Sequence, residues 1–308
     1  MSDLAGRLDR CSINTATLGY QLPIGQTIEA VARAGFGAIA PWRRELEGES
    51  ARLVSRRIRD AGLTVSGYCR STYIPAASDT EFAENIEDNR RAIDDAAELG
   101  AACFVMVVGG LPQGSKDLAD ARHQVRDGIA RLLEHAGAQN VPLAIEPLHP
   151  MYAADRACIN TLRQALDLCD ALDPSQTGTV GVAVDLYHVW WDPDLKTQIL
   201  RAGHSKRLLG FHLCDWLVPT NDMLLDRGMM GDGVIDIHGV RPGLPLRFPG
   251  FGNLKVVPPP LSKEELRTFR LQFHLPGEGL SAGSGDEYVR ALFHDVACQE
   301  DRIPNIGH

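Results

Sequence analysis

Residues 80–108, TEFAENIEDNRRAIDDAAELGAACFVMVV, contain a helix-length segment, a glycine and an apolar run in direct succession. Gly100 follows the helical part, Thr80–Leu99, at the place where a helix C-terminus often needs a positive φ angle. The run Cys103–Val108 is apolar nearly throughout, which is typical of a parallel strand covered on both faces. This stretch therefore predicts one repeating unit of an α/β fold with a parallel sheet.

The same order of segments recurs along the chain, and Gly35 and Gly62 each lie between a helical segment and a strand. The expected strands are Cys11–Ala16, Ala38–Ala40, Thr64–Tyr68, Cys103–Val108, Pro142–Glu146, Thr179–Asp185 and Leu208–Cys214. The expected helices are Thr27–Ala34, Ser50–Ala61, Thr80–Leu99, Leu118–Ala138, Asn160–Leu172 and Asp194–Arg201. Seven such units predict a (β/α)8 TIM barrel, with a doubly wound open sheet as the alternative.

The repeating pattern ends near residue 238. Between Gly239 and Pro260 the chain has six prolines and four glycines, a density that no helix tolerates. We therefore divide the chain into residues 1–238, which hold barrel units one to seven, and residues 239–308, an atypical Pro/Gly-rich C-terminal segment. The eighth unit is expected in this second part, and the sequence there is compatible with an incomplete eighth unit.

Bulk composition indicates a soluble cytoplasmic protein. The 308 residues carry a formal net charge of −9, which argues against nucleic acid and anionic membranes as partners. We find no targeting leader and no apolar run near the roughly 18 residues that a membrane span needs. The seven cysteines form no C-x-x-C pair, which favours buried, reduced thiols over a disulfide framework.

Three successive strands end in a carboxylate or an imidazole, namely Glu146, Asp185 and His212. In a parallel barrel the active site lies at the C-terminal ends of the strands, which are about 4.8 Å apart. The three side chains should therefore converge, and two carboxylates with one imidazole suit Mn²⁺, Co²⁺, Mg²⁺ or Zn²⁺. The alternative for each residue alone is a strand-end polar group in contact with solvent.

Four further residues are candidates for substrate binding. His188 follows Asp185 by three positions, in the loop above the same site. The planar fork of Arg227 suits oxygen acceptors, although a surface ion pair is an equal alternative for it. His149 and Trp42 follow other strands and are candidates to line the mouth of the barrel.

Four runs carry a family resemblance, and they are Ala144–Pro150, Val182–His188, Phe211–Trp216 and Gly231–Asp236. They resemble the sugar phosphate isomerase/epimerase family of the xylose isomerase-like TIM barrel superfamily, over roughly residues 11 to 238. This superfamily also contains ketose 3-epimerases, inosose dehydratases and the endonuclease IV repair enzymes. The resemblance implies that Glu146, Asp185 and His212 are metal ligands and that His188 and Arg227 contact substrate oxygens.

The C-terminal segment departs from the family pattern. Family members add a fourth ligand, a Glu in the eighth strand, which also serves as a proton-transfer group. Nothing after Gly239 matches that strand, and Glu278 and Glu287 are the only loose candidates for this ligand. A shifted reading frame in the coding DNA and true divergence both explain the departure.

The resemblance and the three strand-end ligands together predict a divalent-metal-dependent sugar or sugar-phosphate isomerase/epimerase with a small-molecule carbohydrate substrate. Glu146 is expected to transfer a proton next to a carbonyl, through an enediolate. The alternatives are an inosose-type dehydratase on the same metal, and a catalytically impaired barrel that binds a sugar or a metal. Cleavage of DNA is disfavoured by the charge of −9. A homo-oligomer is compatible with the sequence, which shows no interface signature.

Overall fold

The computed structural model describes residues 8–18, 22–224, 226–228 and 231–236. The predicted boundary near residue 238, the C-terminal segment and the candidate ligands Glu278 and Glu287 therefore lie outside the described residues.

Strands form at all seven predicted positions. They are β1 (Ser12–Asn14), β2 (Ala38–Ala40), β3 (Thr64–Val65), β4 (Tyr68–Cys69), β5 (Phe104–Met106), β6 (Leu143–Ile145), β7 (Val180–Asp185) and β8 (Leu208–His212). The third predicted strand is divided in two, because β3 pairs with β2 whereas β4 pairs with β5. Ser66 and Gly67 lie between the two pieces, and an isolated parallel bridge from Trp42 to Cys69 links their sheets.

The order of the strands identifies the architecture. The sheets run β1-β2-β3 and β4-β5-β6-β7-β8, and every pair within them is parallel. Each strand therefore lies beside its neighbour in the sequence, whereas a doubly wound sheet reverses its order at a switch point. The described strands form a curved wall of a TIM barrel, and the alternative of a doubly wound sheet is wrong.

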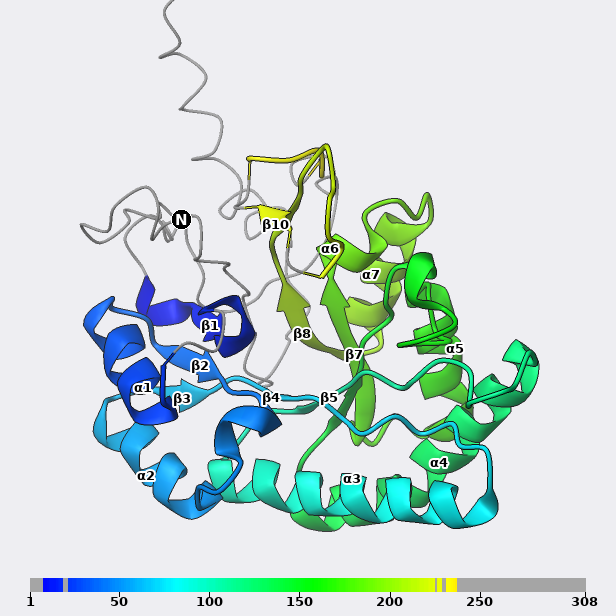
Figure 1. Ribbon diagram of the computed structural model, residues 1–308, viewed down its shortest axis with the longest axis horizontal. Helices are drawn as coiled ribbons and strands as arrows, with labels where there is room; N and C mark the ends of the chain where they lie inside the picture. Colours follow the sequence, from blue (N-terminus) through cyan, green and yellow to red (C-terminus); the bar gives the residue numbers. More distant parts are fainter. Residues whose placement is uncertain (1–7, 19–21, 225, 229–230, 237–308) are drawn as a thin grey trace, which may run out of the picture.

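Helices cover the outside of this wall (Figure 1). They are α1 (Ile24–Arg33), α2 (Ala51–Asp60), α3 (Asp79–Leu99), α4 (Leu118–Gln139), α5 (Leu162–Leu172) and α7 (Leu195–His204). Gly100 ends α3 in the left-handed region with φ of 69°, as the sequence predicts. The short helix α6 (Leu186–Val189) follows β7 at the mouth, and β9 (Asp215–Trp216) pairs there with β10 (Arg227–Gly228) in antiparallel fashion.

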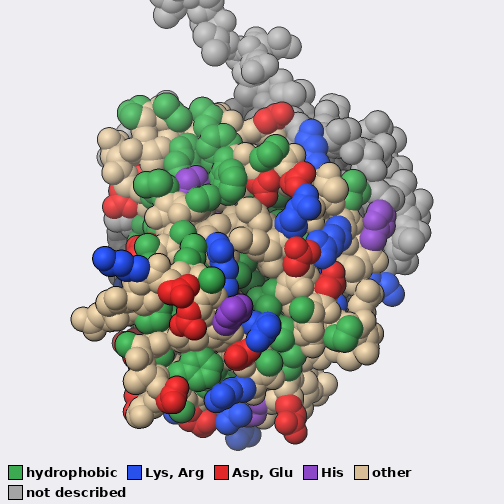
Figure 2. Space-filling view, turned by 90° about the vertical axis from the view of Figure 1, so that its right-hand side faces the viewer, with side chains coloured by type: hydrophobic (Ala, Val, Ile, Leu, Met, Phe, Trp, Pro, Cys, Tyr) green, Lys and Arg blue, Asp and Glu red, His purple; other side chains and the backbone are tan. Residues whose placement is uncertain are grey.

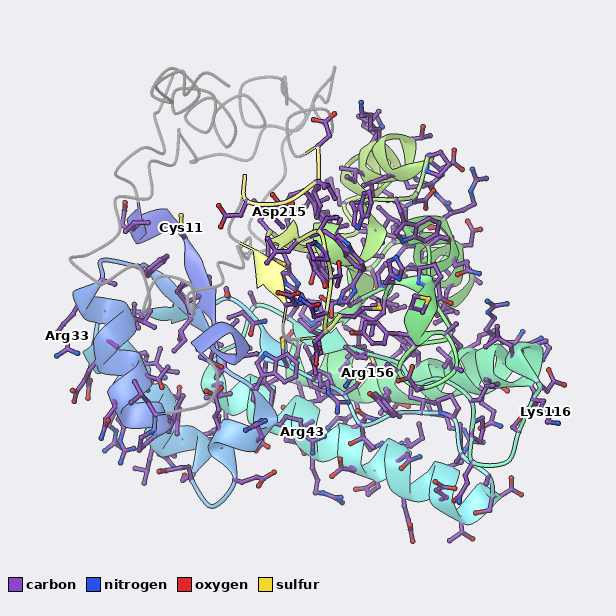
Figure 3. The ribbon with its side chains drawn as sticks, turned by 45° about the horizontal axis from the view of Figure 1, so that its top comes forward. Cys11, Arg33, Arg43, Lys116, Arg156 and Asp215 are labelled. Carbon is purple, nitrogen blue, oxygen red and sulfur yellow. The ribbon has the colours of Figure 1, made fainter. Side chains whose placement is uncertain are left out.

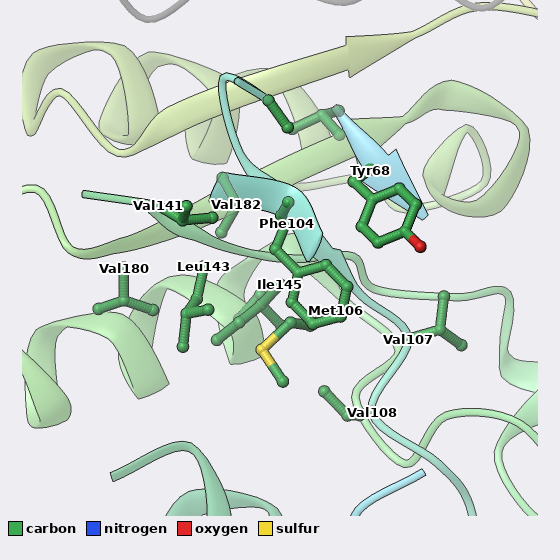
Figure 4. Close-up of a cluster of buried hydrophobic side chains, with 14 of the residues drawn as sticks. Tyr68, Phe104, Met106, Val107, Val108, Val141, Leu143, Ile145, Val180 and Val182 are labelled. Carbon is green, nitrogen blue, oxygen red and sulfur yellow. The ribbon is translucent and has the colours of Figure 1, made fainter. Parts of the chain in front are cut away.

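Side chains alternate between an outer and an inner core along the strands. Phe104, Met106, Leu143 and Ile145 are fully buried between the sheet and the helices (Figure 4). The opposite face carries an inner cluster, which consists of Cys69, Cys103, Val105, Ala144 and Ala183.

This alternation also sets the position of the acidic strand ends. Ala144 and Glu146 share one face of the chain, and so do Ala183 and Asp185, because side chains repeat every two residues. Both carboxylates therefore point into the barrel, above small alanine side chains.

The surface carries charges of both signs (Figure 2), and the described cysteines are buried, as the composition suggests. Acidic and basic side chains are interspersed over the face of the molecule seen in Figure 2. The six cysteines within the described residues are buried thiols, and Cys298 lies outside the described part. Among the described helices, none combines the length and the apolar character that a membrane crossing requires.

Candidate metal centre

Glu146, Asp185 and His212 meet at the C-terminal ends of three adjacent strands. Glu146 directly follows β6, Asp185 ends β7, and the sheet register pairs Asp185 with His212 of β8. One ligand atom from each residue lies within 4.8 Å of the others, and all three side chains are buried. The structure thus brings together the three strand-end groups that the sequence singles out.

The imidazole of His212 is tied to the carboxylate of Glu146. His212 Nδ1 lies 2.8 Å from Glu146 Oε1. Burial lowers the pKa of His212, but the hydrogen bond and the charge of Glu146 outweigh burial, and the net pKa is raised. The two residues form a compact oxygen and nitrogen donor set.

Asp185 remains ionised although it is buried. Its Oδ1 accepts a hydrogen bond from Tyr187 N at 2.9 Å, and its Oδ2 accepts one from Arg227 Nη1 at 3.0 Å. Burial raises the pKa of Asp185. The positive charge of Arg227, followed by the nearby imidazoles, lowers the pKa by a larger amount, so the net pKa is lowered. The tight turn into α6 therefore holds this carboxylate in place.

The charges of the centre fit a divalent cation. Two buried carboxylates, Glu146 and Asp185, face one permanent cation, Arg227. Buried charges are costly unless they are compensated, and a divalent cation bound between these two carboxylates would compensate them. Two oxygen donors and one nitrogen donor suit Mn²⁺, Co²⁺, Mg²⁺ or Zn²⁺.

His188 and Arg227 lie together beside the ligand set. Arg227 Nη2 is 3.0 Å from His188 Nε2, and the Arg227 guanidinium stacks over the Tyr187 ring at 4.1 Å. The Arg227 side chain is only 12% exposed, which excludes the alternative of a surface ion pair. Burial lowers the pKa of His188 to about 3, so its imidazole is neutral.

Aromatic rings form a wall at the mouth, with Trp216 at its centre. Trp216 stacks on Tyr187 at 4.7 Å and lies 5.0 Å from the ring of His149. The wall continues through Trp190, 5.8 Å from Trp216, and Trp191, 6.0 Å from His149. His149 thus takes part in the wall, and burial lowers its pKa.

Trp42 lies in the barrel interior. Its ring packs against the inner cluster, and its indole Nε1 donates to Asn14 Oδ1 at 2.6 Å. The backbone N–H of Trp42 donates to Glu45, which also accepts from the Thr15 hydroxyl. Trp42 therefore lines the barrel from the side of β1 and β2.

Asp215 is a positioning residue that reasoning from the sequence missed (Figure 3). Its Oδ1 accepts from the backbone N–H groups of Trp216 and Ile235, at 2.8 and 3.0 Å. Its Oδ2 accepts from those of Gly231 and Gly233, at 2.9 and 3.0 Å. One buried carboxylate thereby anchors residues 231–235 to the β9–β10 ribbon that carries Arg227.

The glycine at position 233 is required by this anchor. A Cβ atom there would lie 2.2 Å from Trp216 O and 2.6 Å from Asp215 Oδ1. Two features of the sequence could have indicated this anchor. One is the acidic residue Asp215, which comes directly after the predicted strand Leu208–Cys214, and the other is the Gly231-Asp232-Gly233 run later in the chain.

Known structures share this architecture. Protein SMc04130 of Sinorhizobium meliloti 1021 is 55% identical over 76% of this chain and 83% of its own, with a TM-score of 0.72. The 3-keto-D-glucoside 4-epimerase YcjR of E. coli is 20% identical over 71% of this chain and 80% of its own, with a TM-score of 0.58. The IolI protein with a bound zinc atom is 17% identical over 74% of this chain and 81% of its own, with a TM-score of 0.61.

The comparison with protein families gives the assignment. No curated protein matches the chain. The family model described as xylose isomerase-like TIM barrel matches residues 28–269, which is most of the chain. The chain therefore belongs to the xylose isomerase-like TIM barrel family.

Proposed function

We propose that the protein is a divalent-metal-dependent isomerase or epimerase of a sugar or sugar phosphate. The observation that carries the proposal is the convergence of Glu146, Asp185 and His212 within 4.8 Å inside the mouth of the barrel. The E. coli neighbour named as an epimerase and the zinc-bound neighbour support this choice.

In this proposal Glu146, Asp185 and His212 hold the cation. When bound, a divalent cation would polarise the carbonyl and hydroxyl oxygens of the substrate and offset the negative charge of an enediolate. His212 orients the Glu146 carboxylate through the 2.8 Å hydrogen bond between them. Asp185 receives two hydrogen bonds, which fix its position beside the other two ligands.

Glu146 also moves the proton. Its carboxylate takes the proton from the carbon next to the carbonyl, and the resulting acid returns a proton to the neighbouring carbon when the reaction is an isomerisation. Epimerisation at the same carbon needs a second acid on the opposite face of the enediolate, and Glu146 then serves as one of the two acid/base groups. His188 and Arg227 hold substrate oxygens while this happens. The aromatic wall around Trp216 limits the access of water, which strengthens the charged interactions within the site.

We also propose that residues 1–238 form barrel units one to seven and that 239–308 are a separate C-terminal segment. The family match, which runs to residue 269, extends past this boundary. A protein truncated after His238 tests the division, because it should retain a cooperative unfolding transition if the seven units fold without the remainder.

Metal content and hydrogen exchange test the proposed function. The purified protein should contain, or take up, one divalent cation per chain, measured by elemental analysis. With Mn²⁺ and a panel of ketohexoses and their phosphates in D₂O, it should incorporate deuterium next to the carbonyl of one sugar, seen by NMR.

Matched variants assign the residues. Glu146→Ala, Asp185→Asn and His212→Ala should each lose cation binding or deuterium exchange, whereas Asp155→Asn, which removes an exposed charge, should lose neither. A wild-type protein that binds no divalent cation contradicts the proposal. A product lighter by one water would instead assign an inosose-type dehydratase on the same centre.

A further inference from the structure

One buried aromatic side chain, Tyr187 of α6, contacts the β9–β10 ribbon at three points. Its ring centre is 4.1 Å from the guanidinium carbon Cζ of Arg227. The ring of Trp216 is stacked against it, with 4.7 Å between the ring centres and 29° between the planes. The Tyr187 hydroxyl donates to Met223 O at 2.9 Å. A single side chain thus contacts both strands of the ribbon and the segment that joins them.

The pairing of the ribbon explains two of these contacts. Trp216 of β9 and Arg227 of β10 are directly opposite each other in the antiparallel register. Side chains of directly opposite residues project on the same face, with their Cβ atoms about 5 Å apart. The indole and the guanidinium therefore reach the Tyr187 ring together, as a cross-strand pair. The ribbon cannot move away from α6 without breaking both contacts.

The turn that contains Tyr187 also supplies two hydrogen-bond acceptors for Arg227. Arg227 Nη1 donates to Asp185 Oδ2, and Arg227 Nη2 lies 3.0 Å from His188 Nε2. A guanidinium can only donate, so this imidazole nitrogen accepts. The His188 ring is packed edge to face against Tyr152 and Tyr187, at 5.9 and 5.5 Å. This one turn thus holds a guanidinium through a carboxylate, an aromatic ring and an imidazole.

The three contacts require an arginine at position 227. A guanidinium is flat and has its donors in a fixed fork, so it can lie over a ring while two of its nitrogens reach two acceptors. The ammonium group of a lysine is a compact point of charge and cannot do both. The ring of Tyr187 therefore fixes the plane of the fork, and this plane decides which acceptors the two nitrogens reach.

We propose that Tyr187 is a positioning residue, which holds the Arg227 guanidinium in the orientation that serves Asp185 and His188 at once. Without the ring, the guanidinium is free to turn and both hydrogen bonds weaken. The importance of these contacts rests on the proposed function, in which Asp185 holds the cation while Arg227 and His188 hold substrate oxygens. The positioning itself involves only residues of the chain, so it can be tested without cation or sugar.

Nuclear magnetic resonance of the guanidinium protons tests the proposal in the metal-free protein. A guanidinium that is buried and held in this way exchanges its N–H protons slowly with water. Arg227→Lys identifies the signals of Arg227, because they are missing from its spectrum. We expect them to persist in Tyr187→Phe, which keeps the ring, and to exchange about tenfold faster in Tyr187→Leu, which has no ring.

Tyr73→Leu is the matched control for the loss of a ring. The Tyr73 ring also packs against an arginine, because the Arg70 guanidinium lies 4.7 Å from its centre, on the segment after β4. This variant should leave the exchange of the Arg227 protons as it is in the wild type. An equal acceleration would show that the loss of any such ring disturbs Arg227, which contradicts a specific role for Tyr187.

A double-mutant cycle in urea gives a second readout. If Tyr187 acts through Arg227, Tyr187→Leu should destabilise the wild type more than it destabilises Arg227→Ala. Equal effects in the two backgrounds mean that the ring only fills space, which overturns the proposal.

The remaining outcomes separate this proposal from the proposed function. If Tyr187→Leu does not fold, the wild type and Tyr187→Phe still give an answer. The positioning role is overturned if the wild type has no slowly exchanging Arg227 protons, or if Tyr187→Phe loses them. A protein that keeps these signals as expected, but binds no divalent cation and exchanges no sugar, overturns the proposed function alone.

Discussion

Arg227 of β10 donates to Asp185 of β7 across 3.0 Å, although the two residues are 42 positions apart in the sequence. The side chains are 12% and 1% exposed, so this is a buried ion pair. It connects the β9–β10 ribbon, which follows β8, to a candidate metal ligand. The proposed substrate-binding residue and a proposed metal ligand therefore share one electrostatic contact.

The loss of this ion pair should lower stability. Arg227→Ala leaves Asp185 buried without its cation, and removing one partner of a buried pair costs about 3 kcal/mol. Urea unfolding of the metal-free protein measures the change. Arg126→Ala, which removes an exposed pair with Asp127, is the control and should cost less than about 1 kcal/mol. An equal decrease in the free energy of unfolding in both variants would show that the buried pair contributes no more to stability than the exposed pair does.

A divalent cation should stabilise the folded protein. Because the cation binds the folded chain, Mn²⁺ at about 100 times its dissociation constant should add about 2.7 kcal/mol to the free energy of unfolding. Chelation should reverse the gain. In Asp185→Asn the midpoint of thermal unfolding should no longer respond to Mn²⁺, and a response as large as that of the wild type would contradict the assigned ligand.

Replacing Asp215 should loosen the loop that it anchors. Asp215→Asn removes the charge and turns one acceptor oxygen into a donor that faces backbone N–H groups, at a cost of about 2 to 4 kcal/mol. Hydrogen exchange at the amides of Gly231, Gly233 and Ile235 should accelerate. Asp232→Asn, at an exposed position of the same loop, should leave these rates unchanged. Protected amides in Asp215→Asn would contradict the anchor.

Glu45 should make stability depend on pH. Burial, partly offset by hydrogen bonds from Thr15 and Trp42, raises its pKa above 4.5 in the folded protein. A raised folded-state pKa gives stability that is complete below the unfolded value and is lost as pH rises through the folded value. Glu45→Gln keeps an acceptor but has no charge, so its stability relative to the wild type should increase as pH rises above 4.5. Urea unfolding between pH 4 and 7 measures this, and a relative decrease would show that the carboxylate is favourable in the fold.

The strand ends could be predicted because a short local pattern decides them. Val180–Asp185 is buried throughout, and the predicted strand Thr179–Asp185 differs from it by one residue. Because side chains alternate between the two faces of a strand, Asp185 lies on the inner face of the barrel. The same alternation in the neighbouring strands places Glu146 and His212 on that face. The division of the third strand was not predictable, because it depends on which neighbours β3 and β4 pair with.

The supporting residues of the site depend on contacts between distant segments, which a single sequence does not display. Asp215 binds amides up to 20 positions away. Tyr152 meets His188 only because the loops after β6 and β7 converge. The sequence alone is equally compatible with a surface ion pair for Arg227, and only the burial of its side chain excludes this alternative.

The alanines beneath the ligands, Ala144 and Ala183, are fully buried in the inner cluster and lie two residues before Glu146 and Asp185 on the same strands. A change to valine at either position would add volume to a close-packed interior and displace the strand that carries the carboxylate. The small size of these two side chains therefore fixes how far the ligands reach into the mouth.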